Sequence, residues 1–334
     1  MKIIVDIFGG DNAPLAPLRG ASRAVKELGV EILAVGDIPK MEKCRADNGI
    51  DLTGITFRQA DGVFEMEDDP ADIVKKRTDT SLYVALKRLA DGEGDALVSA
   101  GSTGALLMGA TFIVKRIKGC RRPALGSVLP GKNPGGFMLM DCGANAEVRP
   151  EMLSQFALMG SVYMEKVAGR QNPRVALLNN GAEPTKGTET HKEAYKLLSE
   201  RKDINFIGNI EGRDVMNDMA DVVVADGFSG NIALKVSEGV ANFMNAGIKD
   251  ILKTNLKTKI AALLIKKELK AFKAKLDYSE YGGAPVLGVK AGVIKAHGSS
   301  DAKAIKNAIR QAEIYAGNDV SGLIARRINT EEES

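Results

Sequence analysis

The chain has 334 residues, of which 44% are apolar and 27% charged, with 46 basic against 43 acidic side chains. This composition excludes a fibrous or disordered chain and is typical of a globular protein with a sizeable core. Its three cysteines form no C-x-x-C pair and it has only two histidines, which argues against a disulfide framework or a zinc site. The opening MKIIVDIFGG reaches Asp6 after three apolar residues. That run is too short for a secretion signal, so we expect a cytoplasmic protein.

Six short apolar runs, each followed by a small polar loop, predict repeated strand–loop–helix units. They are residues 3–7, 96–98, 138–140, 176–178, 206–207 and 222–224. The loops carry glycine with Asn, Asp or Ser where a helix would begin. This alternation predicts an α/β fold with a mostly parallel sheet covered on both faces, and we expect the loops to meet beyond the carboxyl ends of the strands. No proline-rich linker or low-complexity tract divides residues 1–334, which predicts a single domain.

Residues 96–114 carry no charge over 19 positions, a length that could cross a bilayer. Small polar residues interrupt this stretch at its centre: Ser99, Gly101, Ser102, Thr103 and Gly104. The pattern therefore predicts a buried strand, a turn and a buried helix. Backbone N–H groups and hydroxyls in such a turn can bind an anion such as phosphate, although glycine-rich turns are also common as simple connections.

Two later loops offer further groups for an anion or a polarised carbonyl. The loop at 179–187 contains Asn180 and sets Lys186 beside a glycine, although many such lysines are only solvated. The loop at 226–231 contains Asn231, whose amide can donate to an oxyanion. Its other candidate residues are Asp226, Gly227, Phe228 and Gly230. The alternative for this second loop is a helix cap supplied by Ser229 or Asn231.

His297 lies just before a helix expected to begin near Ser300, where it could act as an acid, a base or a phosphate ligand, or have only a structural role. His191 falls inside a predicted helix at 188–199 and is expected to be structural. The sequence lacks a G-x-S-x-G elbow, a Walker lysine motif and H-E-x-x-H. A covalent enzyme intermediate is therefore not favoured.

One region concentrates the positive charge. Residues 249–275 hold nine lysines against Asp250 and Glu268, whereas the net charge of the whole chain is +3. Apolar residues at helical spacing precede and follow the cluster Leu263, Leu264 and Ile265. The pattern predicts a protruding helical hairpin at about 232–277 whose tip, Ile260 to Ile265, is apolar and ringed by lysine. Residues 249–275 therefore carry a net +7 and the remainder of the chain 3 − 7 = −4, so the basic character is local.

Taken in order, the loop motifs resemble those of a known family. They are VDIFGGDNAP, VSAGSTGALL, RPAL at 122–125, LMDCGAN (which contains Asn145), FALMG at 156–160, the Lys186-Gly187 loop, FIGNIEGRD, DVVVADGFSGN, YGGAPVLG and KAHGSSDAKA. The sequence resembles the bacterial acyl-(acyl carrier protein):phosphate acyltransferases, the PlsX family, from Val5 to about Ile328. The resemblance implies a Rossmann-like α/β/α sandwich related to the isocitrate and isopropylmalate dehydrogenases and to phosphate acetyltransferase.

The resemblance also implies a reaction. A fatty acyl group passes from the carrier-protein thioester to inorganic phosphate, which is itself the nucleophile, and no metal or other cofactor is expected. Carried over by motif, the catalytic residues are Lys186 and Asn231, with Asn180 beside them and His297 as a weaker candidate. Binding of phosphate and the acyl group is carried onto Ser99, Gly101, Ser102, Thr103, Asn145, Asp226, Gly227, Phe228 and Gly230.

Two positions depart from the family pattern. Asn12 stands where family members generally have histidine, which makes an essential imidazole in the opening loop improbable. Ser102 stands where they have asparagine, which keeps a hydrogen-bonding group with a shorter reach.

The hairpin has three interpretations. Its tip residues Ile260, Leu263, Leu264 and Ile265 could rest on anionic lipid, its stems could pair with a second copy in a homodimer, or its lysines could meet the acidic carrier protein. We expect a peripheral membrane protein whose product passes to a glycerol-phosphate acyltransferase, and no nucleic-acid partner. The alternative functions are a phosphate acyltransferase acting on short acyl-coenzyme A, a dehydrogenase of the related fold, and a non-catalytic membrane-recruited scaffold.

Overall fold

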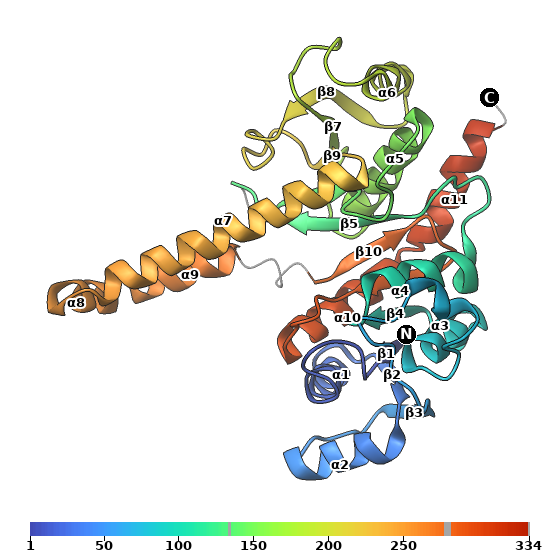
Figure 1. Ribbon diagram of the computed structural model, residues 1–334, viewed down its shortest axis with the longest axis vertical. Coiled ribbons are helices and arrows are strands. Elements are labelled where there is room, and N and C mark those ends of the chain that lie inside the picture. The colour runs from blue at the N-terminus through green and yellow to red at the C-terminus, as the bar shows by residue number, and fades with distance from the viewer. Residues whose placement is uncertain (133–134, 277–281, 333–334) are drawn as a thin grey trace.

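The computed structural model describes residues 1–132, 135–276 and 282–332, and its core is one mixed sheet of 11 strands (Figure 1). The strand order is β3-β2-β1-β4-β11-β10-β5-β6-β9-β7-β8. The strands are β1 (Lys2–Asp6), β2 (Glu31–Gly36), β3 (Ile55–Gln59), β4 (Ala96–Ser99), β5 (Ala124–Leu129), β6 (Phe137–Met140), β7 (Arg174–Asn179), β8 (Asn205–Glu211), β9 (Val222–Val224), β10 (Ala284–Leu287) and β11 (Gly292–Lys295).

The six predicted strands are confirmed as β1, β4, β6, β7, β8 and β9. The expectation of a helix after residues 206–207 is wrong, because 208–211 continue β8 and turns then lead into β9. The other five strands were not predicted. Two of them, β10 and β11, come from the far end of the chain and insert at the centre of the sheet, a placement that no local pattern indicates.

The two halves of the sheet run in opposite directions. Strand β4 is parallel to β11, whereas β10 is antiparallel to both β11 and β5, and β5 is antiparallel to β6. Strands β6, β9, β7 and β8 are then parallel to one another. The carboxyl ends of β4 and β11 therefore lie at one edge of the sheet and those of β6, β9 and β7 at the other. The expectation that all the loops meet at one edge is wrong.

Helices cover both faces of the sheet and make an α/β/α sandwich. One face carries α1 (Leu15–Leu28), α2 (Ile38–Asn48), α5 (Pro150–Lys166), α6 (Glu189–Glu200), α10 (Ala302–Gly317) and α11 (Val320–Glu332). The other carries α3 (Ser81–Ala90), α4 (Thr103–Gly109), a 3-10 turn at Pro70–Val74 and a π-helical turn at Ala110–Lys115. Strand residues alternate between the two cores, with Ile3 and Val5 in one and Ile4 in the other, as the two-residue period of a strand requires.

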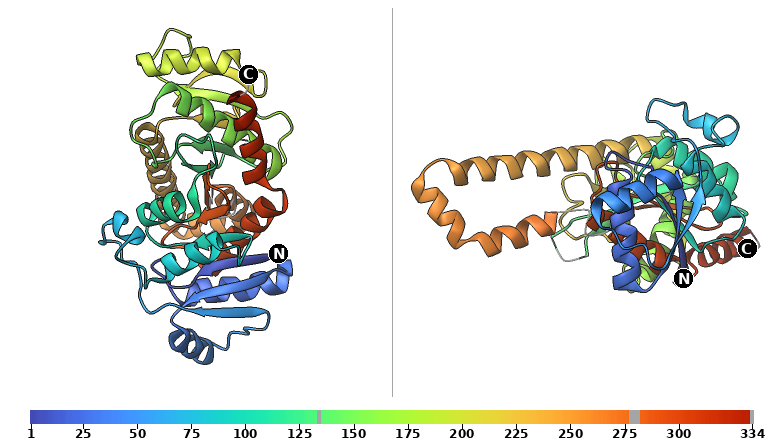
Figure 2. Two further views of the ribbon diagram at one scale, coloured as in Figure 1. Left: turned by 90° about the vertical axis from the view of Figure 1, so that its right-hand side faces the viewer. Right: turned by 90° about the horizontal axis from the view of Figure 1, so that it is seen from below.

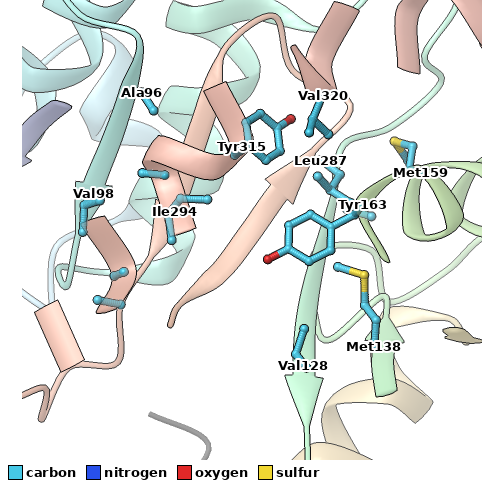
Figure 3. Close-up of a cluster of buried hydrophobic side chains, with 14 of the residues drawn as sticks. Ala96, Val98, Val128, Met138, Met159, Tyr163, Leu287, Ile294, Tyr315 and Val320 are labelled. Carbon is cyan, nitrogen blue, oxygen red and sulfur yellow. The ribbon is translucent and has the colours of Figure 1, made fainter. Parts of the chain in front are cut away.

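The first of these cores is continuous across the reversal of strand direction. Tyr163 of α5 and Tyr315 of α10 lie close together, with ring centroids 6.5 Å apart (Figure 3). The Gln311 amide donates a hydrogen bond to the Tyr163 hydroxyl, which satisfies that buried oxygen. Figure 3 shows Leu287 and Met138 beside the Tyr163 ring. Residues from both halves of the sheet thus pack into one core.

The predicted hairpin is present and projects far from the sheet (Figures 1 and 2). It consists of α7 (Gly227–Lys253), α8 (Leu256–Leu264) and α9 (Lys266–Leu276), which returns toward the sheet. It begins at Gly227, five residues before the expected start, and its predicted last residue, 277, lies outside the described residues. Among the described residues, no helix is both long and apolar enough to cross a bilayer.

Candidate active site

The turn after β4 is held by a buried carboxylate. The Asp6 side chain accepts hydrogen bonds from the hydroxyls of Ser81 and Ser99, each at 2.7 Å. The Ser99 hydroxyl in turn accepts the Gly101 N–H at 3.1 Å. Burial raises the pKa of Asp6, and these hydrogen bonds oppose that shift. A β-carbon at Gly9 would lie 2.6 Å from both the Asp6 carboxylate and the Gly101 nitrogen, so the close approach of these loops requires glycine.

The same turn is held from the other side by Lys295, which the sequence analysis did not single out. Lys295 ends β11, is 8% exposed, and donates hydrogen bonds to the carbonyls of Ala100, at 3.3 Å, and Ala296. Burial lowers its pKa from 10.5 to about 8, while the charges of Asp11 and Asp6 act in the opposite direction. The Ser99–Thr103 turn is thus fixed between a buried acid and a buried amine.

The two family departures take part in the structure around this turn. The Asn12 amide donates to the carbonyls of Ser299 and Ser300 at 3.1 and 3.2 Å, and so joins the opening loop to the His297 loop. The Ser102 hydroxyl caps α4 by accepting the Ala105 N–H at 3.5 Å. Ser102 therefore has a capping role.

His297 is exposed, and its ring is oriented by its own loop. Its Nδ1 accepts the Ser299 N–H at 3.2 Å and lies 2.8 Å from the Ser299 hydroxyl. In the neutral imidazole this arrangement assigns the proton to Nε2. His191, by contrast, lies in α6 with its Nδ1 2.8 Å from the hydroxyl of Thr188, the cap of that helix. His191 thus has a structural contact, in line with its expected role.

At the opposite edge of the sheet, Asn145 connects two loops. Its side-chain amide donates to the Asp141 carboxylate and to the Pro123 carbonyl, both at 2.9 Å, and its backbone carbonyl accepts the Gly227 N–H at 2.7 Å. A β-carbon at Gly227 would lie 2.7 Å from the Asn145 oxygen. Asn145 therefore positions the first residues of α7.

Asp226 begins α7 as its N-cap, with its carboxylate accepting the Ser229 N–H at 2.8 Å. The alternative of a helix cap supplied by Ser229 or Asn231 is therefore wrong, and the Asn231 amide is left for another role. Asn231 is half-buried and lies next to Gly143, where an added β-carbon would be 3.5 Å from the Asn231 Cγ. Gly230 is buried against the Asp141 carbonyl, and the 64% exposed Phe228 projects outward.

Lys186 and Asn180 lie on the loop after β7, at the same edge as Asn231 because β7 and β9 are parallel neighbours. Both are exposed. The Asn179 amide donates to the Lys186 carbonyl at 3.1 Å, and the Lys186 N–H donates to the Glu183 carbonyl at 3.1 Å. Gly187 has φ +87°, a conformation that favours glycine. The loop backbone is thus ordered while the Lys186 amine remains exposed.

A cavity of about 150 Å³ lies between the two edges, where α7 passes in front of the central strands. Its polar lining residues, which supply hydroxyl, amine and imidazole groups, are Thr103, Ser127, Lys295, His297 and Ser300. The remaining lining includes the apolar residues Leu125, Val128, Cys142, Leu234, Ala284 and Ala304, together with Glu238. Leu234 lies three residues after Asn231 on α7, and Cys142 directly precedes Gly143. The cavity therefore borders both groups of candidate residues, although Lys186 does not line it.

A second basic region, which the sequence analysis did not single out, directly precedes β5. Residues 115–122 contain five basic and no acidic side chains, although the chain outside residues 249–275 carries a net negative charge. The density of charge in this short segment was a signal that the sequence contained.

No cluster of three or more His, Cys, Asp or Glu able to hold a metal is found in the part of the chain that the structure describes.

Comparison with known proteins gives consistent results along the whole chain. A family model described as "Fatty acid synthesis protein" matches residues 1–323. A phosphate acyltransferase of Clostridioides difficile (strain 630) is 47% identical over 311 residues, covering 93% of this chain and 91% of that protein. A phosphate acyltransferase of Bacillus subtilis (strain 168) is 44% identical over 334 residues, covering 99% of each chain.

Solved structures with a similar fold include two transacylases. A phosphotransacetylase from Streptococcus pyogenes aligns with a TM-score of 0.65 and 16% identity, covering 95% of this chain and 94% of that one. A branched-chain phosphotransacylase from Enterococcus faecalis V583 aligns with a TM-score of 0.58 and 15% identity, covering 95% and 99%. At these identities the likeness establishes the fold alone, and it confirms the Rossmann-like sandwich that the family resemblance implied.

Proposed function

Because the chain belongs to the fatty acid synthesis protein family, whose matched relatives are phosphate acyltransferases, we propose that it moves a fatty acyl group from an acyl carrier protein to inorganic phosphate. The chain is an acyltransferase, so the alternative of a non-catalytic scaffold is wrong. The acyl-phosphate product serves phosphatidic acid synthesis and passes to a glycerol-phosphate acyltransferase. The carrier-protein donor and this place in lipid synthesis are our proposal.

The cavity between the two sheet edges is the observation that carries the proposal. Among its lining residues, Thr103, Lys295 and His297 offer groups that suit phosphate, and Leu125 and Leu234 offer apolar surface that suits the first carbons of an acyl chain, with Glu238 also in the lining. A reaction that joins phosphate to an acyl group needs both surfaces side by side, because positioning is the main contribution that the protein can make.

In the proposed reaction, an oxygen of hydrogen phosphate attacks the thioester carbon and forms a tetrahedral oxyanion. The Asn231 amide stabilises that charge together with the Lys186 amine and Asn180, which would have to reach the reacting carbon from the opposite sheet edge, outside the lining of the cavity. The C–S bond then breaks, and the proton from phosphate passes to the departing sulfur, by way of His297 in the cavity wall. Lys295 and Thr103 hold the phosphate, while Asp6 positions the turn through Ser99. No side chain becomes acylated.

Donor choice tests the proposal. We expect phosphate-dependent loss of the thioester from acyl carrier protein, with a much lower kcat/KM for short acyl-coenzyme A at equal concentration. Preference for the short coenzyme A thioester would instead support the alternative donor. Trapping an acylated side chain during turnover would contradict direct attack by phosphate.

Lys186→Ala tests the catalytic assignment, because removing one oxyanion donor costs about 100- to 1,000-fold in kcat. Lys192→Ala is the matched control, since Lys192 lies on the neighbouring α6, where it pairs with Glu189 at 2.8 Å. We expect the control to retain full activity. Unchanged turnover by Lys186→Ala would remove this residue from the mechanism.

For the hairpin we propose two contacts, one at its tip and one along its stem. The tip residues Leu263 and Leu264 are 72% and 79% exposed, and, ringed by lysine, they fit the surface of an anionic membrane. Along the stem, Val236, Val240 and Phe243 are exposed at helical spacing, and they fit the same face of a second copy. The protein would then be a homodimer held peripherally at the membrane. A monomeric mass in solution would contradict the dimer.

A further inference from the structure

We propose that the carrier protein docks on a basic face formed by residues 115–122 and Arg149, and that the lysine-rich hairpin is left for the membrane. This inference rests on the proposed function, because it names where the acyl donor of that reaction binds. It decides between two of the partners that the sequence left open for the hairpin.

The first observation is unbalanced charge. Residues 115–122 contain five basic side chains, Lys115, Arg116, Lys118, Arg121 and Arg122, all of them exposed. Within the described residues, none of these five nor Arg149 forms an ion pair, whereas Arg174 elsewhere is paired with Asp221 at 3.0 Å. A cluster of arginines with no carboxylate at ion-pair distance attracts an acidic partner and speeds the encounter.

The second observation is the shape of the surface. Arg121, Arg122 and Arg149 rim a groove of about 550 Å³ whose other lining residues are Val148, Met152 and Glu147. A groove with apolar side chains between guanidinium groups fits an amphipathic helix with acidic flanks. Arginine also binds carboxylates and phosphates in a bidentate manner, and a carrier protein bears both an acidic surface and a phosphate-linked prosthetic arm.

The third observation is position. The groove is connected to the candidate catalytic loops, since the Asn145 amide donates to the Pro123 carbonyl, next to Arg122, and the Asn145 carbonyl accepts from Gly227. Gly227 opens the helix that carries Asn231. The basic face is therefore at the same edge of the sheet as Lys186 and Asn231. A carrier docked there would have its thioester close to the residues proposed to stabilise the oxyanion.

The hairpin tip differs from the basic groove in its position and in its surface. It lies far from the sheet (Figure 1), and its lysines alternate with exposed leucine and isoleucine at the end of two helices. A carrier held at the tip would present its thioester far from Lys186. The two basic regions therefore fit different partners, the one near the site a protein and the distant one a lipid surface.

The test compares two charge reversals of equal size. Arg121→Glu with Arg122→Glu is expected to raise the KM for acyl carrier protein at least tenfold at low ionic strength, with kcat retained at saturation. Lys249→Glu with Lys253→Glu, on the hairpin, is the matched control and should leave KM within twofold in an assay without membranes. The KM of the wild type should rise with added salt, and that of the groove variant should depend on salt less steeply.

Each outcome decides a separate point. An unchanged KM in the groove variant, or a larger effect in the hairpin variant, would overturn the docking site. If the reversal impairs folding, as judged by thermal unfolding, Arg122→Gln and Arg149→Gln provide the same test with smaller changes, and a KM equal to that of the wild type would again overturn it. Failure of the wild type to consume acyl carrier protein at all would refute the proposed function instead.

Discussion

Two helices of this protein use their apolar residues in opposite ways. In the 17-residue α5, 12 residues are buried, including Phe156 and Tyr163. In the 27-residue α7, only Gly227 and Gly230 are buried, and Phe243 is 77% exposed. Apolar side chains on α5 stabilise the fold, whereas those on most of α7 remain available for another surface. The comparison teaches that an amphipathic pattern identifies a helix without saying what covers its apolar face.

Truncating one phenylalanine in each helix should give the largest contrast. Phe156→Ala leaves a cavity in the core and is expected to lower the free energy of unfolding by about 3–5 kcal/mol. Phe243→Ala removes no buried contact and should change it by less than about 0.5 kcal/mol for the isolated chain. Urea unfolding at protein concentrations low enough to disfavour association measures both. Equal losses would show that α7 is part of the cooperative core.

The membrane interpretation of the exposed tip can be tested without affecting the body of the protein. Leu263→Glu with Leu264→Glu removes two apolar contacts, each worth about 1.5–3 kcal/mol when buried, and adds two charges that anionic lipid repels. Flotation with vesicles containing phosphatidylglycerol should then recover little of the variant, while its turnover in solution stays normal. Undiminished recovery would eliminate the tip as an anchor.

The buried Lys295 predicts a pH dependence of stability. Its pKa is lowered to about 8 in the folded state, against 10.5 for an unperturbed lysine. Between these values the unfolded chain binds more protons, so the free energy of unfolding rises with pH, by up to about 3 kcal/mol. Urea unfolding at pH 7.5 and pH 9.5 should show wild type gaining stability relative to Lys295→Met. A difference between the two proteins that does not vary with pH would contradict a buried, charged amine.

The smallest expected effect on stability concerns the point where α7 begins at the sheet. Asp226 caps α7 where this helix leaves the sheet, and Asp226→Ala should cost about 1 kcal/mol of stability. Asp250→Ala, in the exposed part of the same helix, is the control and should have almost no effect. Thermal unfolding of both variants measures the difference, and equal melting temperatures would show that the cap contributes nothing.

Local patterns accounted for much of this structure. The buried strands around Ile4, Val98 and Val223 were predicted because each is a short apolar run that a polar loop ends. The hairpin was predicted because apolar spacing continued through a region dense in lysine. The candidate residues Thr103 and His297 do line one cavity. The roles of Lys186 and Asn231 stay predictions, although the structure places both at the same sheet edge.

Other features depend on contacts between distant parts of the chain. Nothing in the sequence near Lys295 indicated that it is buried. It is buried because β11 pairs with β4, which brings its amine to the Ala100 carbonyl. The basic loop at 115–122 lies near the candidate catalytic loops because the Pro123 carbonyl accepts a hydrogen bond from the Asn145 amide, a contact that the sequence does not indicate.

The sequence by itself determined the fold class, most of the parallel strands and the projecting helical hairpin, because periodicity and loop chemistry act within a few residues. Only the tertiary structure decided that the sheet reverses direction at β10 and β5, and hence which loops lie together. Strand β10, from the far end of the chain, inserts antiparallel between β11 and β5, and the consecutive strands β5 and β6 also pair antiparallel. The insertion of β10 joins residues far apart in the sequence, which a local pattern does not indicate.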